Sequence, residues 1–303
     1  MSLLTSTKKK KSYKGNFYTP QWSFLNPSVL FLFIMAIFPL AFSLVITFTD
    51  MRLLAETTSF IGLDNWRKLL TDKNAFIVLR NTVVFVGIGC IVQYTIGLIM
   101  AILINLDVKG RTFFRIIFLL PMMVAPIAIS YVIGKMVFSE SFGPINDILF
   151  RIGLSPFAWS ISSWKSMAVV ISIDTWQNVP FFILVLLAGL QSIPDELFEA
   201  ARVDGATSIE IFFHIIFPLL IPISVTTIII RALNAFQVID IIRIVTGGGP
   251  GNSTESATLF AYDIGIKGQD IAYGSTIAFA LLIVVGLFTI LFLAFGRLIT
   301  PKK

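Results

Sequence analysis

The chain has 303 residues, of which 56% are hydrophobic and only 13% are charged. Soluble domains carry about 25% charged residues, so this composition excludes an ordinary soluble domain and predicts that most of the chain lies in lipid. The net charge of +6 does not indicate a nucleic-acid partner, because five lysines crowd the first fourteen residues: Lys8, Lys9, Lys10, Lys11 and Lys14. Such a cluster beside an apolar helix is typical of a cytoplasmic tail facing anionic membrane lipid.

Six apolar stretches are long enough to cross a membrane, which requires about 20 residues each. They cover about 27–49, 81–106, 114–137, 166–193, 211–239 and 271–297. We interpret the first as an uncleaved span rather than a secretory signal, because it is too long and lacks a cleavage site. The sequence therefore predicts an all-α integral membrane protein. Its transmembrane domain covers 27–299, between an N-terminal tail (1–26) and a C-terminal tail (300–303).

An even number of spans places both termini on one side of the membrane. The basic residues on the side of the lysine tail cluster in short segments beside helix ends, where the positive-inside rule operates. We therefore expect both termini and segment 194–210 to be cytoplasmic. The segments 50–75, 139–165 and 240–270 are then expected outside.

The fourth span carries polar residues where lipid would disfavour them. Asp174, Gln177, Asn178 and Phe181 are spaced i, i+3, i+4 and i+7, which places them on one face of a helix. A charge at membrane depth usually faces a cavity or a partner. This face is therefore a candidate for the path of a transported solute.

The connecting segment (194–210) interrupts the apolar pattern with charged residues. Pro194 followed by Asp195 and Glu196 is a favourable helix start, since carboxylates stabilise the positive end of the helix dipole. Gly205 then permits a sharp reversal. The pattern predicts a short helix, a glycine turn and the start of the fifth span, which Pro218 can bend.

The fifth span repeats the polar pattern with Arg231, Asn234 and Gln237. Asp174 and Arg231 each lie nine residues from the expected outer end of their span, which is roughly 13 Å at 1.5 Å per residue. The two charges can therefore meet at one level. They either belong to a polar solute site or form a structural pair that fixes two helices, and both roles can hold together.

The connecting segment resembles a known motif. Glu199-Ala200-Ala201, followed at fixed spacings by Gly205, Ile215 and Pro218, is similar to the EAA motif of binding-protein-dependent ABC importer permeases. Phe217 stands where that motif usually has leucine. Four further stretches resemble the carbohydrate branch, the maltose and glycerol-phosphate importers: FIGLDNWRKLL (60–70), FFRIIFLLPMMVAPIAIS (113–130), SFGPINDIL (141–149) and TGGGPGNSTES (246–256).

The resemblance implies a type I ABC importer permease fold with six spans and a sugar, polyol or glycoside as solute. It also implies that the connecting segment docks on a cytoplasmic ATPase through Glu199, Ala200, Ala201, Asp204, Gly205, Ile215 and Pro218. The implied partners are a second permease subunit, with a heterodimer expected, two ATPase subunits and an extracytoplasmic solute-binding protein. ATP and Mg²⁺ would be bound by the ATPase, no cofactor by this chain, and the location would be a prokaryotic inner membrane.

Two other functions compete with this interpretation. An ion-coupled secondary transporter using Asp174 explains the buried carboxylate but leaves the connecting segment without a role. A membrane-embedded enzyme lacks a catalytic constellation, since the chain has a single histidine (His214), which fits a helix end at the membrane surface, and no G-x-S-x-G motif. The sequence also lacks G-x-x-x-x-G-K-[ST], so we expect ATP hydrolysis on a separate subunit.

Overall fold

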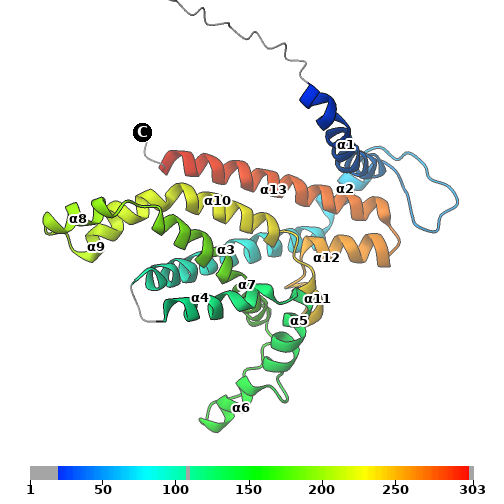
Figure 1. The fold of residues 1–303 in the computed structure, drawn as a ribbon. Coiled ribbons are helices and arrows are strands. Elements are labelled where there is room, and N and C mark those ends of the chain that lie inside the picture. Colours follow the sequence, from blue (N-terminus) through cyan, green and yellow to red (C-terminus); the bar gives the residue numbers. More distant parts are fainter. Residues whose placement is uncertain (1–19, 107–109, 300–303) are drawn as a thin grey trace, which may run out of the picture. The chain divides into compact units, whose positions relative to one another are not determined.

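The computed structural model describes residues 20–106 and 110–299, and every named element in these ranges is a helix (Figure 1). The lysine tail, Lys109 and the C-terminal tail lie outside the described residues. The chain forms two compact units, 1–45 and 46–303, which are described separately.

The first unit contributes helix α1 (Pro20–Ile46), which continues one residue into the second unit. The described side chains of α1 are almost all apolar and exposed, for example Leu32 at 66% and Phe38 at 64%. Since water does not tolerate such a surface over a whole helix, α1 is built to lie in lipid or against another apolar surface.

Four long helices form the body of the second unit: α3 (Lys73–Asn105), α7 (Ser163–Gln191), α10 (Phe217–Ala235) and α13 (Ile271–Ile299). Figure 1 shows that α3, α10 and α13 extend in a common direction, and α3 makes its most extensive contact with α7. Buried Phe85, Ile173 and Phe236 join α3, α7 and the end of α10 in one apolar cluster. The core is therefore formed between long helices, as in other membrane bundles.

The region of the predicted span 114–137 is not one continuous helix. It is divided into α4 (Arg111–Leu119), η1 (Leu120–Met123), α5 (Pro126–Ile129) and η2 (Ser130–Val137). The two halves meet at an angle of 94°. Pro121 and Pro126 explain the break, because proline lacks the N–H group that a continuous helix requires.

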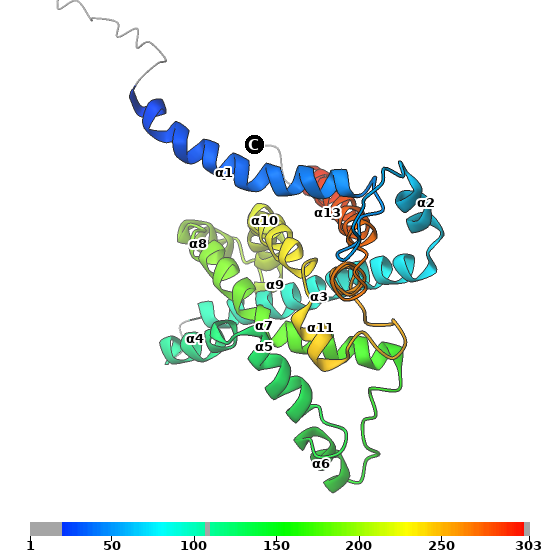
Figure 2. The ribbon, with the colours of Figure 1, turned by 90° about the vertical axis from the view of Figure 1, so that its right-hand side faces the viewer.

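The remaining helices are short connections between the long ones. They are α2 (Asp64–Thr71), α6 (Pro144–Arg151), α8 (Asp195–Val203), α9 (Ser208–Ile211), η3 (Phe212–Ile216), α11 (Asp240–Val245), α12 (Ala257–Tyr262) and η4 (Asp263–Lys267). Figure 1 shows α8 and α9 at one end of the long helices, and Figures 1 and 2 both show α6 projecting away from these helices. In Figure 1, α12 lies at the opposite end.

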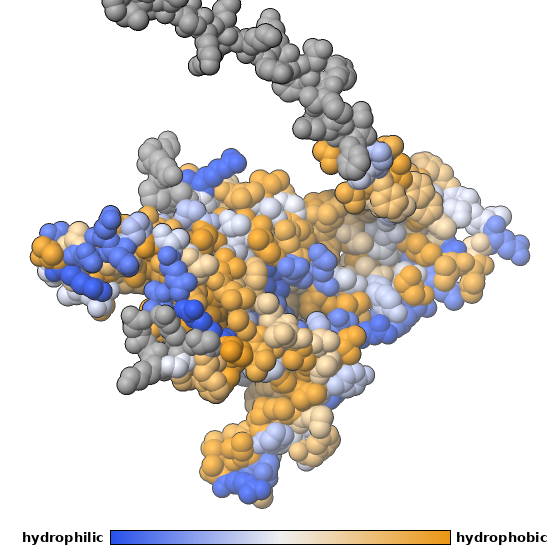
Figure 3. Space-filling model, viewed as in Figure 1, coloured by the Kyte–Doolittle hydropathy of each residue, from blue (hydrophilic) through white to orange (hydrophobic). Residues whose placement is uncertain are grey.

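The surface is apolar over much of the long helices, while hydrophilic residues gather over α8 and α9 (Figure 3). Within the described ranges, five helices are long and apolar enough to cross a membrane, or six if the bent pair around Pro121 and Pro126 counts as one span. The predicted all-α membrane fold is therefore confirmed.

Candidate functional site

Helix α8 is defined by strong local signals at both ends. It begins after Pro194, with Asp195 and Glu196 in its first turn. At its other end the Ala206 amide donates to the Ala201 carbonyl over 2.9 Å, and Gly205 adopts a φ of +81°. This is a Schellman arrangement, in which the left-handed glycine lets the chain reverse and cap the last carbonyl groups.

Helix α9 starts immediately after this turn with a capping box. The Thr207 amide donates to Glu210 Oε2 over 2.8 Å, and the Glu210 amide donates to Thr207 Oγ1 over 3.4 Å. The π-helical turn η3 follows, with His214 exposed and its Nδ1 2.9 Å from the Glu210 carbonyl oxygen. Local hydrogen bonds therefore fix the shape of the whole connecting segment.

The connecting segment has little tertiary support from the rest of the chain. No residue of α8 is buried, Glu199, Ala200 and Asp204 are exposed, and Ala201 is half-buried. Val203, the last residue of α8, is 88% exposed. The segment is thus a preformed, mainly unpartnered surface. Ile215 and Pro218, which complete the motif, are half-buried in η3 and the first turn of α10.

Asp174 and Arg231 meet in the interior of the helix bundle. Their side chains are 5% and 4% exposed, and Arg231 Nη2 pairs with Asp174 Oδ2. Gln93 of α3 bridges them: its Nε2 donates to Asp174 Oδ2 over 2.7 Å, and its Oε1 accepts from Arg231 Nε over 2.8 Å. Asn178 Nδ2 donates to Asp174 Oδ1 over 3.0 Å. These four side chains form the polar network.

The polar network links three helices at one level. Because each charge is paired and also hydrogen-bonded, the network meets the conditions under which buried charges are tolerated. It also occupies the atoms that a solute would need. In this conformation the network therefore holds α3, α7 and α10 together and leaves no free charge.

Four predicted solute-path residues lie outside the polar network. Gln177 donates instead to the Val124 carbonyl over 3.1 Å, and Phe181 packs edge-on against Phe182. Asn234 and Gln237 are exposed, and their amides bond to carbonyl groups of their own chain. Arg231 is buried whereas Asn234 and Gln237 are exposed, and Gln237 lies beyond the end of α10 at Ala235, so the three residues do not share one environment.

Gln93 was not among the site residues predicted from the sequence. A glutamine in an otherwise apolar stretch was the available signal, because an amide in lipid also needs partners. The motif 246–256 also gains a structural role. Asn81 Nδ2 donates to the Asn252 carbonyl over 2.7 Å, and Thr82 Oγ1 accepts from the Ala257 amide over 2.9 Å.

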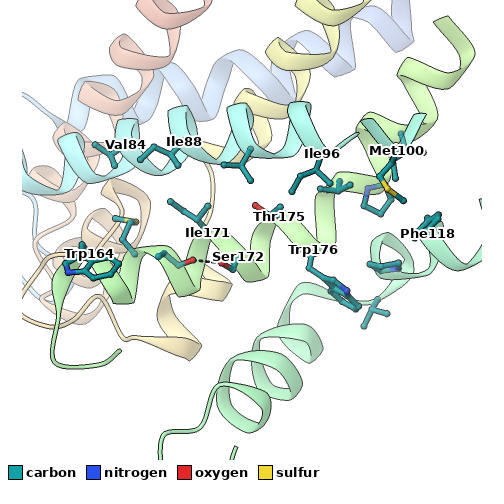
Figure 4. Close-up of a pocket in the computed structure, with 18 of the residues that line it drawn as sticks. Val84, Ile88, Ile96, Met100, Phe118, Trp164, Ile171, Ser172, Thr175 and Trp176 are labelled. Atoms are coloured by element: carbon teal, nitrogen blue, oxygen red, sulfur yellow. Dashed lines mark hydrogen bonds between the residues drawn. The ribbon is translucent and has the colours of Figure 1, made fainter. Parts of the chain in front are cut away.

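A large groove lies between α3, α7 and the α4–η1 segment (Figure 4). Its volume is about 1390 Å³, and none of the predicted solute-path residues lines it. The α7 side contributes Ser172, Thr175 and Trp176, while α3 contributes Ile88 and Ile96. We call this surface the α3–α7 groove.

The fold is similar to that of solved ABC importers. A chain of a bacterial alginate ABC transporter, crystallised with an alginate-bound periplasmic protein, superimposes with a TM-score of 0.81 at 20% identity. The match covers 93% of this chain and 96% of that one. A methionine ABC transporter chain gives a TM-score of 0.52 at 18% identity over 78% of this chain and 99% of that one. The chain therefore has the fold of type I ABC importer permeases.

Sequence comparison gives the family. Residues 93–303 match the family described as "Binding-protein-dependent transport system inner membrane component". The trehalose/maltose permease protein MalF of Thermococcus litoralis is 37% identical over 78% of this chain and 80% of its own length. The multiple sugar-binding permease protein MsmF of Streptococcus mutans is 33% identical over 89% and 92%. The chain belongs to the family of binding-protein-dependent inner membrane permeases.

Membership of this family confirms the resemblance noted in the sequence, and it establishes a multi-pass protein of the prokaryotic inner membrane. Proteins of this family are permease subunits and are not themselves enzymes. The relatives do not favour the alternative of an ion-coupled secondary transporter using Asp174. In addition, the Asp174 carboxylate already accepts hydrogen bonds from Gln93, Asn178 and Arg231.

Proposed function

We propose that this chain is the membrane-spanning subunit of an ATP-driven importer for a sugar, polyol or glycoside. It would form half of the translocation path, with both termini in the cytoplasm, and pair with a second, different permease subunit. The printed names of the relatives support the solute class, since they include trehalose, maltose and sulfoquinovosyl glycerol systems. A solute-binding protein would deliver the solute from outside.

The exposed connecting segment is the observation that carries the coupling role. Helix α8 keeps its shape through local hydrogen bonds and has no buried residue, so its surface is available to a partner. We infer that this partner is an ATPase subunit, which would bind ATP and Mg²⁺. Glu199, Ala200, Ala201, Asp204 and Gly205 would form the docking surface, while Ile215 and Pro218 would position it at the start of α10.

The solute path is proposed to use the polar groups that the network leaves available. Asn234 and Gln237 are exposed and bonded only to their own backbone, so they can turn towards a hydroxyl-rich solute. Phe181 and Gln177 would present an aromatic ring and an amide to the same solute, and Asn178, whose amide nitrogen bonds to Asp174, would present its amide oxygen. Asp174 and Arg231 would then orient the two helices rather than contact the solute directly.

The test is uptake by the complete transporter in proteoliposomes, with its binding protein outside and nucleotide inside. Labelled maltose and trehalose would begin a panel of oligosaccharides. We expect uptake that requires internal ATP and persists when proton and sodium gradients are collapsed. Uptake that follows an ion gradient without ATP would contradict the proposal, and loss of every sugar with uptake of another solute class would contradict its substrate part.

A further inference from the structure

A second, smaller cavity lies between η2, the segment 139–160 and the segment 245–250. Its volume is about 610 Å³, within the range of about 300–1,000 Å³ that is common for small-molecule sites. Trp159 and Val245 line it, and both belong to the apolar cluster that also contains Ile173 of α7. Among the described residues, none lines both this cavity and the α3–α7 groove. We call it the η2 cavity.

Hydrogen bonds within the chain fix the walls of the η2 cavity. On one side, Trp159 Nε1 donates to the Phe138 carbonyl over 2.6 Å, and Ser166 Oγ donates to the Trp159 carbonyl over 2.8 Å. On the other side, Thr254 Oγ1 donates to Thr246 Oγ1 over 2.8 Å. Because these bonds require no ligand, the cavity is preformed, which reduces the ordering cost of binding.

The η2 cavity contains one acid and one base that do not pair with each other. Lys135 and Glu140 are its charged lining residues in the described ranges, where neither forms an ion pair. Lys135 Nζ donates to the Val245 carbonyl over 3.1 Å, and Glu140 Oε1 accepts from the Ser160 amide over 2.7 Å. The ammonium group retains two donors, and the carboxylate retains its second oxygen as an acceptor.

This set of groups fits a neutral ligand rich in hydroxyl groups. Lys135 and Glu140 together carry no net charge, so the cavity favours neither an anion nor a cation. Neighbouring hydroxyl groups can donate to a carboxylate and accept from an ammonium at the same time. Phe142 also lines the cavity and is 72% exposed, which leaves its ring available to an apolar C–H face. An acyl chain would leave both charged groups without partners.

We propose that the η2 cavity binds a sugar ring of the solute, at a site separate from the solute path of α7 and α10. Glu140 Oε2 would accept a hydrogen bond from one hydroxyl group, and Lys135 Nζ would donate to its neighbour. The inference rests on the proposed function for the class of solute and for the position of the cavity outside the membrane. The chain would then contact the solute before it enters the path.

The experiment measures protection of a cysteine from alkylation by N-ethylmaleimide in the complete transporter, without the binding protein and without nucleotide. Ser160→Cys places the thiol at an exposed position that lines the η2 cavity, and Ser141→Cys, exposed in the same segment but outside the lining, is the matched control. The sugars are maltose, trehalose and any other member of the panel that is taken up. We expect saturating sugar to slow alkylation several-fold in the Ser160→Cys variant only. Equal rates with and without sugar, or equal slowing at both positions, would overturn the proposal.

A second measurement tests the charged group. Lys135→Met, combined with Ser160→Cys, removes the ammonium and should raise the sugar concentration for half-maximal protection roughly tenfold or more, as for hydrogen bonds to charged groups. Lys73→Met, at an exposed lysine outside the lining, should leave it unchanged. An unchanged concentration in the Lys135→Met variant would exclude the assigned contact.

Two further outcomes separate this inference from its alternatives. Protection of the Ser160→Cys variant by sugar-free binding protein, with none by sugar alone, would assign the cavity to a protein contact and overturn the proposal. ATP-driven sugar uptake without protection by that sugar would remove this inference alone. Absence of uptake for every sugar in the panel would instead remove the proposed function on which it rests.

Discussion

The connecting segment joins α7 to α10, and the polar network bonds these two helices to each other and to α3, yet the two regions use charge in opposite ways. In the polar network, Asp174 and Arg231 are each at most 5% exposed and pair directly, while Gln93 bonds to both and Asn178 bonds to Asp174. In the connecting segment, Glu199, Arg202 and Asp204 are exposed and no residue of α8 is buried. The charges of the first region are paired within the chain, whereas those of the second are exposed.

This difference indicates that the two regions have different roles, one in docking and one in holding helices together. The polar network joins α7, α10 and α3 far from α8, so a force applied to α8 acts on helices that are tied together. The connecting segment keeps its shape through caps and a glycine turn, which require no tertiary contacts. A surface with its own shape and few contacts is suited to docking, and a saturated network is suited to holding helices in register.

The largest effect is expected from breaking the polar network on one side. Asp174→Leu leaves Arg231 buried without its counter-charge, which typically costs about 3–5 kcal/mol. We expect low recovery of folded protein in detergent, measured by size-exclusion chromatography and thermal unfolding. Asp174→Leu combined with Arg231→Leu should recover much of the loss. A stable single variant would show that the pair does not hold the helices.

The next effect concerns the shape of the connecting segment. Gly205 has a φ of +81°, and no atom lies within 4 Å of an added Cβ, so only its backbone conformation constrains the residue. Gly205→Pro cannot adopt this φ and should abolish uptake while membrane insertion stays normal. Gly205→Asn tolerates left-handed conformations and should retain most uptake. Equal uptake by both variants would remove the turn from the coupling role.

Glu255, in the segment between α11 and α12, provides a pH test outside the spans. Burial raises its pKa to about 7, and Asp263 adds to the shift while Lys267 opposes it. An acid whose pKa is raised on folding contributes stability at low pH and loses it as pH rises from about 4.5 to about 7. We expect the wild-type melting temperature to fall over this window, and Glu255→Gln to flatten the fall. Identical pH profiles would contradict the assignment.

The smallest effect is expected at the proposed solute path. Asn234 is exposed and bonds only to the Ile230 carbonyl, so Asn234→Ala should leave folding unchanged. If Asn234 bonds the solute, the loss of one hydrogen bond of about 0.5–1.5 kcal/mol should raise the KM for uptake by about two- to tenfold. Thr226→Ala is the matched control, because Thr226 is exposed on the same helix and bonds only to the Pro222 carbonyl. An unchanged KM would remove Asn234 from the path.

The sequence predicted most of the fold because spans and caps are local signals. Hydropathy indicated the long helices, and the acids after Pro194 together with Gly205 indicated both ends of α8. The sequence also placed Asp174 and Arg231 at one depth. It could not show that Gln93 lies between them, since that contact joins residues 81 and 138 positions apart in the chain. Among the described residues the Thr175 hydroxyl has no hydrogen-bond partner, whereas Ser172 on the same helix donates to the Ala168 carbonyl, and the sequence could not distinguish these two cases.

The central claim is that the connecting segment couples an ATPase to the helices. The most direct test measures ATP-driven uptake by the complete transporter carrying Glu199→Lys, together with the amount of bound ATPase. Glu56→Lys, a charge reversal at an exposed residue before α2, is the control. If the connecting segment couples the ATPase to the helices, Glu199→Lys should lose uptake, either because the ATPase binds more weakly or because it hydrolyses ATP without transport. Uptake by Glu56→Lys should stay normal, and both variants should insert normally into the membrane. Normal uptake by Glu199→Lys with the ATPase bound as in the wild type would contradict the coupling role.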